Sequence, residues 1–81
     1  MQSDINLDHK KYLKKLGDRL KQLRKAKGFS NYEQFAYTYE LSRAQYGRYE
    51  KGANISFKTL LKIIKIHKIS IKEFFAEGFE E

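Results

Sequence analysis

The stretch from Ser30 to Gly52 reads SNYEQFAYTYELSRAQYGRYEKG and contains two short helical patterns separated by a tight turn. Ser30 and Ser42 can each cap a helix. Each is followed three residues later by a side chain that can reach back to the cap, Glu33 in the first case and Gln45 in the second. Gly52 supplies a left-handed stop after the second pattern. The stretch therefore predicts two short helices held at a fixed angle, over about 31–39 and 43–51.

Apolar periodicity predicts three more helices around this stretch. The first covers about 10–27, where four leucines form one stripe and Gly17 lies beside it, at a position that a neighbouring helix can approach closely. The fourth starts after Ser56 and runs to about Lys68, and the fifth starts after Ser70. On the fourth helix we expect an inward face of Phe57, Leu60, Leu61 and Ile64. The fold class is thus all-α, a compact five-helix bundle.

The bulk properties fit one small domain with a polyanionic partner. Of the 81 residues, 1–9 are expected to form a flexible N-terminus, 10–77 the domain, and 78–81 a C-terminal tail. The net charge of +7 is concentrated in residues 1–30, which carry nine Lys and Arg against three Asp. A solvated helix face is the alternative explanation of these lysines.

Several functional classes are disfavoured by composition. There is no cysteine, and two histidines far apart in the sequence do not make a zinc signature, so we expect no metal and no cofactor. No apolar run reaches the ~20 residues that cross a bilayer, and residues 1–10 lack the apolar stretch of a signal peptide. The glutamates and histidines are not arranged as a base–nucleophile pair, and the sequence contains no phosphate-binding loop motif. An enzyme is therefore not expected. A cytoplasmic protein without membrane contact is the expectation.

The third predicted helix carries the residues that would act on a partner. Tyr46 and Tyr49 are expected to point inward, whereas the opposite face carries small and basic residues. A glycine inside a helix costs about 1 kcal/mol relative to alanine, so Gly47 needs a reason. One reason is a flat strip that lets the helix approach base edges in the DNA major groove, and the alternative is an ordinary solvent face. The predicted base-contacting residues are Arg43, Ala44, Gln45, Gly47 and Arg48.

Three further sets of residues complete the prediction. Backbone contacts fix the docking register on DNA, and the phosphate-contacting candidates border the same face: Asn31, Tyr32, Lys51, Asn54, Ser56 and Lys58. Arg24 falls almost on the leucine stripe, so it either pairs with Glu50 as a buried ion pair or extends to solvent. Ile63 and Ile66 do not fit the inward face of the fourth helix, so they are either covered by the fifth helix or form a dimer surface with Phe75 and Phe79.

The sequence resembles the Cro/repressor-type helix-turn-helix domains, also called the XRE family, over nearly all of 16–75. The resemblance is carried by LGDRLKQLRKAKGFS, FA, LSRAQYGRYEKG and SFKTLLKIIKIHKISIKEFF. It implies a lambda-repressor-like five-helix fold, a homodimer and an inverted-repeat operator in double-stranded DNA. It also implies that Arg24 and Glu50 are the buried pair of the family, that Arg43, Ala44, Gly47 and Arg48 face bases, and that Tyr32 touches phosphate. Two departures are Glu40 where glycine is usual in the turn, and one extra residue in SNYEQFA.

The function predicted from the sequence is that of a small, sequence-specific transcriptional regulator of the repressor type, in a bacterial or phage setting and associated with the nucleoid when bound. The alternative is an antitoxin or another protein-interaction module with the same fold, in which exposed apolar side chains bind a protein partner.

Overall fold

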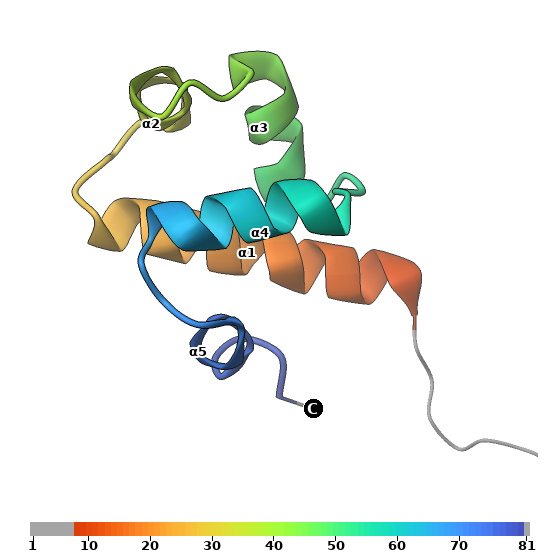
Figure 1. Ribbon diagram of the computed structural model, residues 1–81. Coiled ribbons are helices and arrows are strands. Elements are labelled where there is room, and N and C mark those ends of the chain that lie inside the picture. Colours follow the sequence, from red (N-terminus) through yellow and green to blue (C-terminus); the bar gives the residue numbers. More distant parts are fainter. Residues whose placement is uncertain (1–7, 81) are drawn as a thin grey trace, which may run out of the picture.

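The computed structural model of the chain describes residues 8–80. Within that range there are five helices and no strand, so the predicted all-α, five-helix fold is confirmed (Figure 1). The helices are α1 His9–Ala26, α2 Tyr32–Thr38, α3 Arg43–Glu50, α4 Phe57–Ile66 and α5 Ile71–Phe75.

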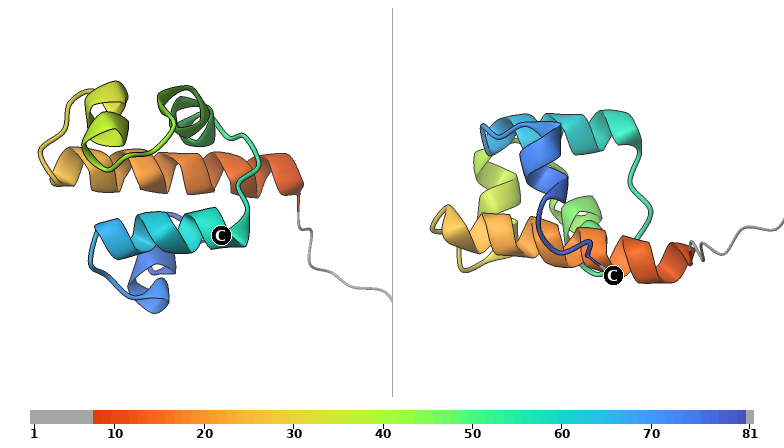
Figure 2. Two further views of the ribbon diagram at one scale, coloured as in Figure 1. Left: turned by 45° about the horizontal axis from the view of Figure 1, so that its top comes forward. Right: turned by 90° about the horizontal axis from the view of Figure 1, so that it is seen from below.

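The long α1 and the shorter α4 run roughly parallel but lie apart, as the right view of Figure 2 shows, and the other helices are distributed over two sides of this pair. α2 and α3 lie on one side and α5 lies on the other, as both views in Figure 2 show. α3 contacts both α1 and α2, while α5 contacts α4. The two short helices around the turn therefore rest on α1 as a unit.

Polar caps begin all five helices, and three of the four predicted serine caps are confirmed. Ser42, Ser56 and Ser70 each accept a hydrogen bond from a backbone N–H of the first turn. The prediction for Ser30 is wrong, because the side-chain oxygen of Asn31 accepts from the backbone N–H groups of Glu33 (2.7 Å) and Gln34 (3.1 Å). An asparagine oxygen that bonds two amides starts α2 one residue later, which accommodates the extra residue in this segment.

The start of α1 includes part of the segment assigned to the flexible N-terminus. Asp8 caps the helix by accepting from the backbone N–H of Lys10 at 3.0 Å, and the helix begins at His9. The rest of that predicted segment, 1–7, lies outside the described residues.

The core is built around Phe35, whose ring is fully buried. It packs against the rings of Phe29, Tyr39 and Tyr46, and it stacks on His67 at a centroid distance of 5.4 Å. Aromatic pairs of this geometry add to the free energy of burial. The buried apolar residues of the described chain are Leu16, Leu20, Phe35, Ala36, Tyr46, Leu60, Ile63, Ile64 and Phe74.

The face of α4 that packs against the core differs from the predicted face by a rotation of the helix. Ile63 is fully buried and Ile66 is half-buried against the core, whereas Phe57 is 60% exposed and Leu61 is 37% exposed. α5 contacts α4 and adds the fully buried Phe74 to the same core as Ile63. Ile63 is therefore not accessible for the predicted dimer surface, whereas Ile66 is only half-buried and its part in such a surface stays a prediction.

A buried arginine that the sequence analysis missed attaches α5 to α1. Arg19 donates from Nε to the carbonyl oxygen of Phe74 (2.7 Å) and from Nη2 to that of Glu73 (2.8 Å). The last carbonyls of a helix lack intrahelical partners, and a cation near them is also favoured by the helix dipole. The sequence signal was available, because Arg19 lies three residues after Leu16 and one before Leu20, within the apolar stripe.

The end of the described chain also packs on α1. The ring of Phe79 lies 4.9 Å from that of Phe75, and the Lys15 ammonium donates to the carbonyl oxygen of Glu80 at 2.9 Å. None of the described helices has the length and apolar character needed to cross a membrane.

Candidate nucleic-acid interface

The end of α3 is fixed to α1 by a buried ion pair. Arg24 donates from Nε to Glu50 Oε2 at 2.8 Å and from Nη2 to Glu50 Oε1 at 2.9 Å, and both side chains are buried. Arg24 Nη1 also donates to the carbonyl oxygen of Phe29 at 2.9 Å. The hydrogen bond to Glu50 raises the pKa of Arg24 against the opposing effect of burial. The predicted pair of Arg24 and Glu50 is confirmed, with the two parallel bonds that favour arginine here.

A close backbone approach accompanies this pair. A Cβ on Gly17 of α1 would lie 2.6 Å from the carbonyl oxygen of Glu50 and 2.7 Å from that of Tyr49. No side chain fits between the two helices at this point, so the predicted role of Gly17 as a site of close helix approach is confirmed.

The expected exposed position of Gly47 is wrong. Gly47 is buried, and a Cβ there would lie 2.5 Å from Cε1 of the Tyr32 ring. The glycine therefore makes room for α2 and does not flatten an outer face. Sequence spacing contained this information, because Gly47 precedes Glu50 by three residues and shares its face of the helix. A helix that buries Glu50 also turns Gly47 inward.

The face of α3 that points to solvent is rotated accordingly. Ala44, Gln45 and Arg48 are exposed and lie on one face, at spacings of one and four residues, while Tyr46 is buried with Gly47. Tyr49 was predicted to point inward, but it is half-buried and its hydroxyl reaches the rim of the exposed face. Ala44, Gln45 and Arg48, with Tyr49 at the rim, are called the recognition face below.

Tyr46 points inward, and its side chain is not accessible from solvent. Its hydroxyl is buried and forms no hydrogen bond with any of the described residues, and burial raises the pKa of this phenol above its ordinary value.

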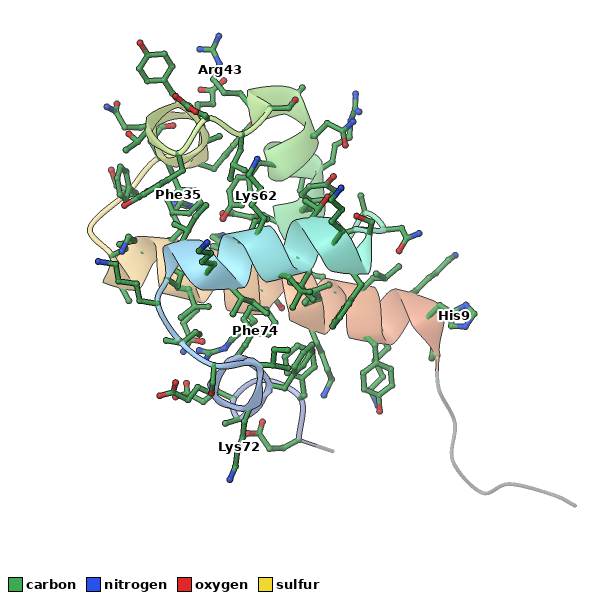
Figure 3. All side chains as sticks on the ribbon, in the orientation of Figure 1. His9, Phe35, Arg43, Lys62, Lys72 and Phe74 are labelled. Carbon is green, nitrogen blue, oxygen red and sulfur yellow. The ribbon has the colours of Figure 1, made fainter. Side chains whose placement is uncertain are left out.

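A polar hollow lies between α2 and the first residue of α3. Arg43, the first residue of α3, is exposed and points away from the bundle (Figure 3). Tyr37 of α2 is 72% exposed and lines the same hollow, a position that the sequence analysis did not assign. The hollow has a volume of about 410 Å³ and is lined by Asn31, Glu33, Gln34, Tyr37 and Arg43. A phosphate or a base edge could contact both a cation and hydroxyl or amide groups here.

The turn itself contains the predicted departure from glycine. Glu40 has φ 57°, the left-handed conformation, and the backbone N–H of Leu41 donates to the carbonyl oxygen of Ala36 at 2.8 Å. Glu40 therefore adopts the left-handed conformation that glycine usually provides in this turn, and its side chain makes that conformation less favourable than glycine would.

The predicted phosphate-contacting residues occupy different environments. Asn31, Lys51, Asn54, Ser56 and Lys58 are exposed, whereas Tyr32 is half-buried against Gly47. The side-chain oxygens of Asn31 and Ser56 already accept hydrogen bonds from their helix N-termini. Asn54 lines a separate groove beside α1. Lys51 and Lys58 have side chains that are exposed and form no ion pair with a described residue, so these two fit a backbone-contacting role best.

The separate groove is apolar and has a volume of about 650 Å³. It runs between α1 and the end of the described chain, with Leu13, Phe75 and Phe79 among its lining residues. Phe75 is 40% exposed and Phe79 is half-buried, so both of these predicted dimer-surface residues remain partly accessible. No group of three or more metal-ligating side chains occurs within residues 8–80.

Comparison with protein families agrees with this geometry. The model of the helix-turn-helix family of the Cro/C1 type matches residues 20–74, which include the buried ion pair, α2, the turn and α3. The chain belongs to this family, also called the XRE family, whose members are DNA-binding regulatory domains that bind double-stranded DNA. The comparisons with curated proteins and with solved structures found no match for the chain.

Proposed function

We propose that this chain is a small repressor-like transcriptional regulator that binds specific DNA sequences with α3 in the major groove. The observation that supports this most is the recognition face, which is exposed, carries Gln45 and Arg48, and has Arg43 at its start. An α-helix fits the major groove, and arginine can donate two parallel hydrogen bonds to guanine. The backbone of α3 is held by Gly17 and by the Arg24–Glu50 pair, so the face is presented from a rigid support.

Selection of bound duplexes from a random pool tests this proposal. Arg43→Ala and Arg48→Ala should each weaken binding to the selected site by about 1–3 kcal/mol and relax its sequence at particular base pairs. Lys51→Ala and Lys58→Ala should instead weaken binding to all sequences. Each should also reduce the slope of log affinity against log salt concentration by about one, the value for one lost phosphate contact.

Lys72→Ala is the matched control, because it removes the same charge from an exposed lysine on α5 that points away from α2 and α3 (Figure 3). Unchanged affinity and selectivity in both arginine variants, or equal losses in the Lys72 variant, would contradict the proposal.

We also propose that the regulator acts as a homodimer on an inverted repeat. The support is an unpaired apolar surface, because Phe57, Leu61 and Phe75 are exposed in the single chain and the apolar groove adjoins Phe75. Sedimentation equilibrium of the wild-type chain should give a dimer, and Phe75→Glu should give a folded monomer. A selected consensus with a single half-site would contradict the dimeric arrangement.

A further inference from the structure

Gln45 and Tyr49 are joined on the recognition face by a hydrogen bond. The Tyr49 hydroxyl donates to Gln45 Oε1 at 3.0 Å, across one turn of α3. The ring of Tyr49 is half-buried and packs against the core, and its backbone carbonyl lies against Gly17 of α1. Tyr49 is therefore anchored on two sides, while its hydroxyl reaches the exposed amide of Gln45.

This bond determines which end of the Gln45 side chain is available. The backbone N–H of Gln45 donates to the Ser42 hydroxyl at 3.3 Å, but the Gln45 side chain does not complete a capping box there, because its Oε1 accepts from the Tyr49 hydroxyl. The carbonyl end of the amide is held by Tyr49, and no residue within 8–80 accepts a hydrogen bond from Nε2. Gln45 thus presents two N–H donors to solvent.

We infer that Tyr49 is a positioning residue that makes Gln45 select guanine, an inference that rests on the proposed DNA-binding function. Guanine presents two adjacent acceptors, N7 and O6, in the major groove, and these match an amide that offers its donors. Adenine presents an acceptor beside a donor, so a glutamine pairs with it in two bonds only when its carbonyl also turns toward the base. Cytosine presents a donor and opposes the N–H groups of Gln45.

Tyr49→Phe is the decisive variant, because it keeps the packed ring and removes only the hydroxyl. Duplex selection with the wild-type chain and with Gln45→Ala first identifies the base pair that Gln45 contacts. At that pair the wild-type chain should prefer guanine over adenine, and Tyr49→Phe should lower this preference about three- to tenfold, the effect of releasing one ordered side chain. The preferences at all other pairs should stay unchanged.

Two controls separate positioning from a general structural effect. In a Gln45→Ala background, the further change Tyr49→Phe should leave the selected sequence unaltered, since Tyr49 acts through Gln45. Tyr39→Phe removes the hydroxyl of another half-buried tyrosine, at the end of α2, and should not alter the preference at that pair. In the free protein, nuclear magnetic resonance relaxation of the Gln45 amide group should show greater mobility in Tyr49→Phe than in the wild-type chain.

Three results would overturn the inference while leaving the proposed function intact. They are an adenine at the Gln45 pair in the wild-type site, an identical consensus for Tyr49→Phe, and an effect of Tyr49→Phe that persists without Gln45. A wild-type chain that selects no duplex would overturn both the proposed function and the inference.

Discussion

α3 is approached by two neighbouring helices, each at a glycine, and the two contacts differ in what the glycine faces. Gly17 on the α1 side faces backbone carbonyl oxygens of α3, whereas Gly47 on the α2 side faces the ring of Tyr32. A carbonyl oxygen moves only if its helix moves, but a half-buried tyrosine ring can rotate. The α1 contact should therefore define the position of the recognition face, and the α2 contact should tolerate change.

The α1 contact also holds the charged pair, and breaking this pair should have the largest effect. Glu50→Ala leaves the guanidinium of Arg24 buried without its carboxylate, so we expect a loss of about 3–5 kcal/mol in the free energy of unfolding by urea. The matched control is Asp18→Ala, which breaks an exposed pair with Lys14 of the same 2.8 Å length and should cost under about 0.5 kcal/mol. Similar losses in the two variants would mean that burial does not distinguish the pairs.

Gly17→Ala should have the next largest effect. Alanine raises helix propensity by about 1 kcal/mol, but its Cβ would meet the carbonyl oxygens of Tyr49 and Glu50, which cannot move independently. Overpacking against backbone should outweigh the gain and leave a net loss of about 2–3 kcal/mol in the free energy of unfolding. A stabilised Gly17→Ala variant would show that α1 and α3 separate easily. It would contradict the conclusion that the α1 contact is the more rigid of the two contacts of α3.

Low pH should destabilise the aromatic core behind α2, because His67 belongs to that core and takes up a proton. Burial, with Lys27 and Arg19 nearby, lowers the pKa of His67 from 6.5 to about 4, and its Nε2 is buried without a hydrogen-bond partner in the described chain. As the pH falls, the unfolded chain takes up the proton on His67 before the folded chain does. The contribution of neutral, buried His67 to the free energy of unfolding is therefore present in full above pH 6.5 and is lost as the pH falls toward 4. The loss between pH 7 and pH 4 should be about 2 kcal/mol larger in the wild-type chain than in His67→Phe. Parallel pH profiles of unfolding would contradict this.

Gly47→Ala should have the smallest effect, and its sign should depend on Tyr32. In the wild-type chain the clash with the ring should roughly cancel the gain in helix propensity, for a net change below about 1 kcal/mol. In a Tyr32→Ala background the ring is absent, so the same substitution should stabilise the protein by up to about 1 kcal/mol. A large loss in both backgrounds would indicate that the α2 contact is as rigid as the α1 contact.

The predictable part of the site consisted of features that local sequence specifies. Ser42, Ser56 and Ser70 cap helices because a short hydroxyl side chain bonds the free N–H groups of the first turn, which needs no distant partner. The Arg24–Glu50 pair was predictable because a charge on an apolar stripe requires a partner. Asn31 displaced Ser30 as a cap because two adjacent capping residues competed and the sequence did not rank them.

The rotations of α3 and α4 were not predicted, because each depends on a neighbour. Gly47 was assigned to an exposed face, yet the ring of Tyr32 lies against it, and for Ile63 the sequence left open whether it is covered, whereas the structure buries it fully. Tyr49 was assigned to the core as an aromatic residue, but its hydroxyl extends to Gln45 at the surface. An amphipathic pattern gives the width of an apolar stripe more reliably than its centre.

The sequence alone determined the number of helices, three of their caps and the partner of Arg24, since these follow from contacts within a few residues or from the cost of an unpaired buried charge. The tertiary structure decided which side of α3 faces solvent. That choice depends on the carbonyl oxygens that Gly17 accommodates and on the ring that Gly47 accommodates, both of which come from other helices. Close packing fixes a helix rotation only when all its neighbours are in place.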